Sequence, residues 1–174
     1  MSRAPSKRTG RRTGTTQTRE QIAVAARSQF AELGYEGATF RGIAAVAGVD
    51  PALVVHFFGS KVELFREVMQ LPPGFSDALA RVADGPRDDV GRRLAELVVG
   101  ALENDATRPV VLGRIRSASS HPQAAALVRE TVTRDLSSLA EAITDDRPET
   151  RAVLVGAQLV GLALARYVVL VEPL

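Results

Sequence analysis

The fold of this chain is decided by residues 39–65, TFRGIAAVAGVDPALVVHFFGSKVELF. Gly48 stands where a left-handed backbone closes a helix, and Asp50-Pro51 supplies an N-cap followed by the proline that suits the first helical position. Ser60 and Glu63 then have the spacing of a capping box, which opens another helix. The stretch therefore predicts three short helices. The first two are joined by a tight glycine-containing turn, the arrangement of a helix-turn-helix.

Helical periodicity continues on both sides of this stretch. Thr18 and Gln21 are spaced as a capping box before a helix predicted over residues 19–33. The apolar stripe of that helix is Ile22, Ala26, Phe30 and Leu33. The pattern breaks at residues 71–74, LPPG, and helical stripes then resume, ending in a helix over residues 149–171 that is apolar nearly all round. No alternating strand pattern and no repeat occurs, so the sequence predicts an all-α protein.

Charge is distributed unevenly along the 174 residues. The net charge is +2, but residues 1–70 hold ten Lys/Arg against six Asp/Glu, and residues 71–174 hold twelve against fourteen. The first twenty residues carry six Lys/Arg and one acid, and they contain no apolar stretch typical of a secretory signal. We interpret residues 1–17 as a disordered basic arm. It is either a solvated tail or a segment that follows the DNA backbone or minor groove.

Several protein classes are disfavoured by composition. The chain has no Cys, which excludes disulfides and thiolate metal sites and suits the cytoplasm. It has only two His and no glycine-rich phosphate loop, HExxH or GxSxG motif, so we predict no enzyme, no catalytic residue, no metal site and no cofactor. The apolar run from Ala152 to Ala165 contains Gln158 and is interrupted at Arg166. It is short for a membrane span, so we predict no membrane association.

The N-terminal part of the chain resembles the DNA-binding domain of the TetR family of bacterial transcriptional regulators. The resemblance covers about residues 18–70. It is carried by Phe30, Gly34-Tyr35, Thr39, Ile43-Ala44, Ala47-Gly48-Val49, Phe58, Ser60-Lys61 and Leu64-Phe65. It implies an N-terminal three-helix DNA-binding domain with a helix-turn-helix, followed over residues 75–174 by a helical ligand-binding and dimerisation domain. That second part resembles the family only in being helical and apolar.

Nine residues of the motif are predicted to contact DNA. Thr39 caps a helix end whose N–H groups attract phosphate, and Arg41 in the first turn reaches toward phosphate or a base. Lys61 lies in the first turn of the third short helix, where the dipole favours anions. A phosphate contact would explain it, and a solvated surface lysine is the alternative. The second short helix, opened by Asp50-Pro51, is the predicted recognition helix, and Val54 and Phe58 should face the core from it. The residues that are then exposed or face the groove are Pro51, Ala52, Leu53, Val55, His56 and Phe57.

The recognition helix departs from the usual pattern of the family. Val55 and Phe57 stand where Tyr or His is usual, so a phosphate contact from these positions is in question. His56 is the one clear base-edge donor, and the aliphatic side chains suit thymine methyl groups. We expect part of the specificity to come from DNA shape, Arg41 or the arm. A purely structural role for Val55 and Phe57 is an equal alternative.

The last helix predicts a homodimer formed through the C-terminal helices. A helix that is apolar on all sides is buried on all sides, which in a small domain favours a partner surface. Ala157, Gly161 and Ala165 recur every four residues, which permits close helix approach. The alternative is the central helix of a monomeric core.

The resemblance also implies a small-molecule effector of unknown identity. An effector pocket is mostly apolar with a few polar anchors. The candidate anchors are Arg114, Arg116, His121, Gln158 and Arg166, each of which has a surface or interface role as its alternative. The sequence of His121-Pro122 is itself typical of the start of a helix.

These features predict a cytoplasmic, ligand-responsive transcriptional regulator, most often a repressor in such families, that binds a pseudo-palindromic operator on double-stranded DNA as a homodimer. The alternative is a helical dimerisation or scaffold protein whose helix-turn-helix does not read specific DNA, and the few polar residues of the recognition helix favour it. Neither operator, effector nor regulated genes follow from the sequence. Family members often carry a further helix after the last one here, so completeness after Leu174 stays open.

Overall fold

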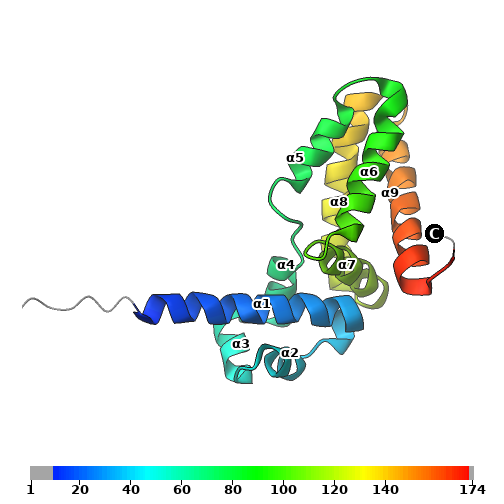
Figure 1. Cartoon of the computed structure of the whole chain (residues 1–174). Helices are drawn as coiled ribbons and strands as arrows, with labels where there is room; N and C mark the ends of the chain where they lie inside the picture. The colour runs from blue at the N-terminus through cyan, green and yellow to red at the C-terminus, as the bar shows by residue number, and fades with distance from the viewer. Residues whose placement is uncertain (1–9, 173–174) are drawn as a thin grey trace, which may run out of the picture.

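The protein is built from helices in two groups (Figure 1). The structure is a computed structural model that describes residues 10–172, with side chains from residue 15 onward except that of Thr131. Within that range it contains no strand, in agreement with the helical periodicity. The helices are α1 (Gly10–Gly37), α2 (Phe40–Ala47), α3 (Pro51–Phe58), α4 (Lys61–Val68), α5 (Phe75–Ala80), α6 (Val90–Glu103), α7 (Arg108–Ser120), α8 (Pro122–Ile143) and α9 (Pro148–Leu164).

The first group, α1 to α4, packs around an aromatic and aliphatic core. The ring of Phe30 is fully buried, and its centroid lies 5.0 Å from that of Phe65 in an edge-on arrangement. Val54 and Phe58 are buried as predicted, with exposed fractions of 0% and 5%. The Arg19 guanidinium lies over the Phe58 ring and pairs with Glu67, which ties α1 to α3 and α4.

The first helix begins nine residues earlier than predicted. It starts at Gly10, so residues 10–17 of the predicted disordered arm are helical, while residues 1–9 lie outside the described residues. Thr18 is therefore inside the helix and is not its N-cap. Extending an existing helix by one residue costs far less than nucleating one, so a helix anchored by packing continues through a sequence of modest propensity.

Leu33, the last residue of the predicted apolar stripe, is 53% exposed, which corrects the prediction. Gly34 directly after it has a φ of 68° and a ψ of −174°, and these angles interrupt the helix where the sequence predicts its end. Beyond the break, Tyr35 lies in the core and its ring stacks on that of Phe30, with 6.0 Å between the centroids. The core cluster at this end of α1 therefore contains Tyr35 and not Leu33.

The second group, α5 to α9, stands above the first in Figure 1. Leu94 of α6 and Leu139 of α8 belong to one core cluster, and Leu136 of α8 packs with Ala152 of α9 in another. α8 and α9 lie side by side, and Gly156 permits their close approach because a Cβ there would meet Leu136 Cδ1 at 2.9 Å. The last helix, expected as one helix to residue 171, changes at Ala165 to a wider π-helical turn that ends at Val169.

The two groups are joined mainly by α7, which lies along α1. Gly113 of α7 sits against Met69 and the Ala31 backbone. Two arginines of α7 donate hydrogen bonds across the junction, Arg116 to the Ala31 carbonyl and Arg114 Nε to the Met69 carbonyl at 2.6 Å. Because Met69 caps the C-terminal end of α4, α7 touches the first group at both α1 and α4.

Two glycine-to-alanine changes should have opposite effects on stability. At Gly113 a Cβ would lie 2.8 Å from Met69 Sδ and 3.3 Å from the Ala31 nitrogen, so alanine should lower the free energy of unfolding by about 1–3 kcal/mol. At Gly100 of α6 a Cβ meets nothing within 4 Å, and alanine there should raise it by up to about 1 kcal/mol. Urea unfolding followed by circular dichroism measures both, and equal effects would contradict the close packing of α7.

Candidate nucleic-acid interface and effector cavity

The helix-turn-helix has the caps that the sequence predicts. Thr39 Oγ1 accepts a hydrogen bond from the Gly42 N–H at 3.0 Å, and Asp50 Oδ1 accepts one from the Ala52 N–H at 2.7 Å. Gly48 closes α2 with a left-handed φ of 67°. The chain bends by 107° between α2 and α3, within the range of about 90–120° that helix-turn-helix units adopt. A helix with this inclination presents its outer face to a major groove.

The outer face of α3 is apolar and exposed. Leu53 and Val55 are 36% and 50% exposed, and Pro51 and Ala52 are exposed with them. His56 is exposed and is the one polar side chain of this face. Phe57 is partly buried and packs against the core, which favours the structural role given above as its alternative to DNA contact. It follows Val54 by three positions and so lies on the same side of the helix.

Lys61 is held by its neighbours at the start of α4. Its Nζ donates to the Glu36 carbonyl at 3.3 Å and lies 4.6 Å from the centre of the Tyr35 ring. Desolvation lowers the pKa of Lys61, and the Glu36 carboxylate partly opposes the shift. An ammonium group has three N–H donors, so Lys61 can donate to the Glu36 carbonyl and still have an N–H group for a phosphate oxygen. Arg41 and Thr39 are exposed on the neighbouring helix start.

The basic excess of residues 1–70 belongs to the first fourteen residues. Residues 1–14 hold five Lys/Arg and no acid, whereas residues 15–70 hold five Lys/Arg and six Asp/Glu. The folded helix-turn-helix is therefore not basic by itself. Electrostatic attraction to a phosphate backbone would come chiefly from the N-terminal segment and from single residues such as Arg41.

An apolar cavity of about 150 Å³ lies within the second group of helices. We call it the apolar cavity. All five helices of that group contribute to its lining, through side chains such as Phe75, Leu94, Val111, Leu136 and Leu159. Its only charged lining residues are Arg114 and Asp135. These two side chains also line a neighbouring polar cleft of about 400 Å³, whose other wall includes Phe65, Arg66 and Met69 at the end of α4.

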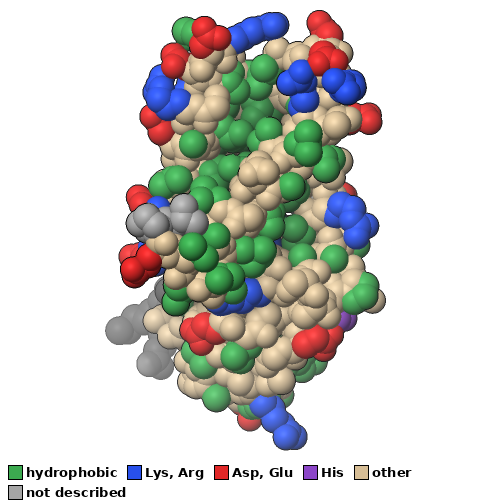
Figure 2. Space-filling view, turned by 90° about the vertical axis from the view of Figure 1, so that its right-hand side faces the viewer, with side chains coloured by type: hydrophobic (Ala, Val, Ile, Leu, Met, Phe, Trp, Pro, Cys, Tyr) green, Lys and Arg blue, Asp and Glu red, His purple; other side chains and the backbone are tan. Residues whose placement is uncertain are grey.

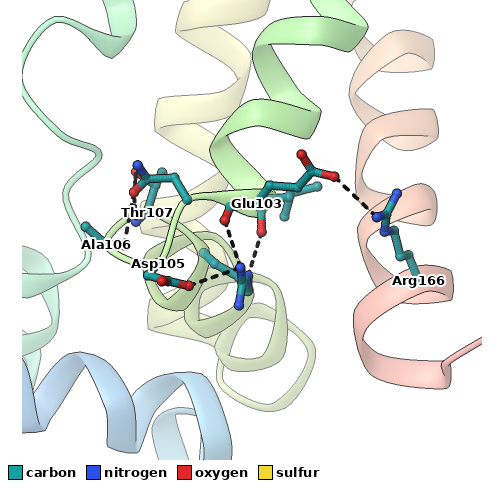
Figure 3. A network of polar contacts seen from close by, with 8 residues as sticks. Glu103, Asp105, Ala106, Thr107 and Arg166 are labelled. Carbon is teal, nitrogen blue, oxygen red and sulfur yellow. Dashed lines mark hydrogen bonds and ion pairs between the residues drawn. The ribbon is translucent and has the colours of Figure 1, made fainter.

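Of the five predicted effector anchors, Arg114 alone lines the apolar cavity. Arg116 holds the Ala31 carbonyl, and His121 lies between the Tyr35 ring, at 4.2 Å, and the Glu36 carboxylate, at 3.4 Å. Gln158 is exposed on α9. Arg166 pairs with Glu103 at 3.4 Å, beside a polar network that closes the α6–α7 loop (Figure 3).

His121 also caps α8 through its backbone, as the His121-Pro122 pair predicts. Asp135 was not anticipated from the sequence, because nothing in the pattern of this amphipathic helix distinguishes an acid that borders a cavity from its exposed acids.

The outer side of α9 is apolar and open. Val153 and Leu154 are 66% and 60% exposed, Ala157, Val160 and Gly161 are exposed beside them, and a Cβ at Gly161 would meet nothing within 4 Å. We call these five residues the α9 face. Figure 2 looks onto this side of the molecule and shows hydrophobic side chains gathered down it. Residues 148–169 are long and apolar enough to cross a membrane, and 17% of an apolar 18-residue stretch within them is buried.

Comparison with known proteins identifies the family. The family model described as "Bacterial regulatory proteins, tetR family" matches residues 22–68, and "Tetracyclin repressor-like, C-terminal domain" matches residues 88–174. A TetR-family regulator from Streptomyces coelicolor A3 is 36% identical in sequence, over 94% of this chain and 87% of that one, with a TM-score of 0.60. The chain belongs to the TetR family of bacterial regulatory proteins.

Two repressors are also similar to this chain. The HTH-type transcriptional repressor AcnR of Corynebacterium glutamicum is 44% identical over 89 residues, which cover 51% of this chain and 43% of that repressor. The match thus spans less than half of the length of AcnR. NalD of Pseudomonas aeruginosa, the secondary repressor of the MexAB-OprM efflux pump, shares the fold with a TM-score of 0.64 and 22% identity over 91% of this chain and 90% of its own. These relatives are regulators of transcription, which is the class that the helix-turn-helix predicted.

Proposed function

We propose that the protein is a homodimeric, ligand-responsive repressor that acts in the cytoplasm and binds a pseudo-palindromic operator on double-stranded DNA. The observation that carries this proposal is the exposed outer face of α3, inclined at 107° to a capped α2. The residues proposed to meet DNA are Thr39, Arg41 and Lys61 at the helix starts, and Pro51, Ala52, Leu53, Val55 and His56 on α3. Phe57 contributes by packing, since it reaches the core.

The α9 face supports the proposed dimer. An apolar helix surface of this size on a soluble regulator needs a cover, and a second copy of the same face provides one by two-fold symmetry. Gly161 and Ala157 leave the surface flat, so two α9 helices can approach closely. A two-fold dimer would place two α3 helices for half-sites about one DNA turn apart, roughly 34 Å. The same cover explains why so apolar a helix need not enter a membrane.

The apolar cavity supports the proposed effector site. It lies beside the end of α4, and Arg114 links its lining directly to the Met69 carbonyl. An effector that prefers one arrangement of α4 and α7 over another would shift the spacing of the two recognition helices. Release from DNA requires this difference in affinity between two states.

A first test of the proposal is the salt dependence of operator binding. Removing residues 2–12, which carry all five N-terminal Lys/Arg, should weaken binding and flatten the plot of log K against log salt concentration. Each lost phosphate contact reduces the slope by about 0.9, so loss of several contacts per dimer should reduce it by about 2 or more. Fluorescence anisotropy between 50 and 300 mM salt gives the slope. An unchanged slope would show that the N-terminal segment is a solvated tail.

A second test addresses how α3 reads bases. The only apolar group that a base pair presents in the major groove is the thymine methyl group, which matches Leu53 and Val55. Replacing operator thymines by uracil should weaken binding by about tenfold in the half-sites, and Val55→Ala should remove most of that sensitivity. Titration of the two duplexes with both proteins measures this. If the methyl groups have no effect on either protein, α3 reads DNA by other means.

A further inference from the structure

The apolar cavity and the polar cleft meet at one guanidinium group. Arg114 projects from α7 between them, and its Nε donates to the Met69 carbonyl. No hydrogen bond from its two terminal nitrogens and no ion pair to a carboxylate is found among the described residues. Asp135 borders the same place, but its carboxylate accepts a hydrogen bond from Arg134 Nε at 3.2 Å. The two terminal nitrogens of Arg114, which carry four N–H donors, are thus available beside a cavity whose lining is otherwise apolar except for Asp135.

The charges around this point leave a positive excess. Arg114, Arg134 and Asp135 together carry one net positive charge, and Arg134 and Asp135 already pair with each other. Desolvation lowers the pKa of Arg114, and the nearby Asp135 opposes the shift. A guanidinium stays charged in proteins, so its partial burial without a bound anion is unfavourable. A single negative charge placed here would relieve that cost.

The cavity also limits the size and chemistry of what it takes. A space of about 150 Å³ lined by aliphatic and aromatic side chains is large enough for a molecule such as benzene. The body of a ligand would therefore be an aliphatic chain or one ring, with no polar group inside. Its polar group would lie at Arg114, where the cavity opens to the polar cleft.

We infer that the effector is a small apolar monocarboxylate, with its hydrocarbon body in the apolar cavity and its carboxylate paired with Arg114. The inference rests on the proposed effector-controlled regulator. A carboxylate and a guanidinium match in a two-hydrogen-bond fork. The Nε of the same guanidinium donates to the Met69 carbonyl. A carboxylate that accepts a hydrogen bond from Nε therefore competes with this bond, which joins α7 to the end of α4. The bound acid would in this way change the junction that positions the DNA-binding helices.

The test compares octanoate with octanamide, which has the same hydrocarbon chain and no charge. Isothermal titration of the full chain should show octanoate binding at least about tenfold more tightly. Arg114→Gln keeps a donor for the Met69 carbonyl and should abolish the preference while octanamide still binds, which shows that the cavity is intact. Arg66→Gln is the matched control, because Arg66 lines the polar cleft and not the apolar cavity and has no part in the Arg134–Asp135 pair, and it should keep the preference.

Several outcomes would overturn the inference. They are equal binding of the two compounds to the wild type, a preference that survives Arg114→Gln, and no binding of either compound. If Arg114→Gln does not fold, Arg114→Lys keeps the charge without the fork and should reduce the preference; an undiminished preference would count against the fork. A dimer that binds a specific operator but responds equally to acid and amide keeps the proposed function and loses this inference. A protein that prefers the acid through Arg114 but binds no specific DNA keeps this inference about the ligand and loses the proposed function.

Discussion

Replacing Thr39 by Asp should leave the fold intact and weaken operator binding by at least about 100-fold. Thr39 caps α2 through Oγ1, and Asp is at least as good an N-cap, with a charge that the helix dipole favours. The same carboxylate would lie where a phosphate is expected to approach, and a dimer carries it twice. A like charge at a contact costs more than the loss of a hydrogen bond. Anisotropy gives the affinity, and thermal unfolding gives the stability.

Two companion variants separate the cap from the contact. Thr39→Ser keeps both the cap and the hydroxyl and should behave as wild type. Thr39→Ala should lose about 1 kcal/mol of stability together with some DNA affinity. If Thr39→Asp bound the operator as tightly as Thr39→Ser, the start of α2 would not face phosphate.

Replacing Leu154 by Glu should convert the dimer to a monomer and abolish tight operator binding. Leu154 is 60% exposed in the single chain, so the change should cost the isolated fold little. In a two-fold interface it would bury two unpaired carboxylates and remove two leucines, which should raise the dissociation constant of the dimer by at least about 100-fold. A monomer also loses the gain in affinity that comes from linking two half-site contacts. Sedimentation equilibrium measures the assembly.

The control for this variant is Val24→Glu. Val24 lies on α1 and is 55% exposed, so it is an equally exposed apolar residue away from the α9 face. It should leave the dimer unchanged. If both variants dissociated to the same extent, or if both stayed dimeric, the α9 face would not be the dimer surface.

Local signals in the sequence were sufficient for the helix-turn-helix. The Asp50-Pro51 start, the Gly48 turn and the Ser60-Glu63 capping box each depend on residues within a few positions, and all three form as predicted. The predicted start of α1 was wrong because the extension of a helix depends on cooperativity along the chain and not on a single capping residue such as Thr18. The prediction for Leu33 was wrong because the core at this end of α1 is completed by Tyr35, which follows the break at Gly34, and periodicity within the helix does not indicate that.

The effector cavity could be anticipated only in general terms. A helical apolar domain suggested a pocket, and Arg114 was one of five candidates for it. What distinguishes Arg114 from Arg116, two positions on, is tertiary: one faces the apolar cavity and the other holds the Ala31 carbonyl. The partners lie 45 and 85 residues away in sequence, so no local pattern encodes them. The apolar face of α3 was foreseen, whereas the packing of Phe57 depended on the core that it meets.

The most direct test of the central claim is a selection of random DNA sequences by the purified protein, followed by sequencing of the bound pool. A homodimer that reads DNA with two α3 helices should enrich an inverted repeat whose half-site centres are about one helical turn, or roughly 10 base pairs, apart. A pool without any enriched sequence would contradict the regulator and favour a scaffold protein. Enrichment of a single unrepeated half-site would contradict the dimer.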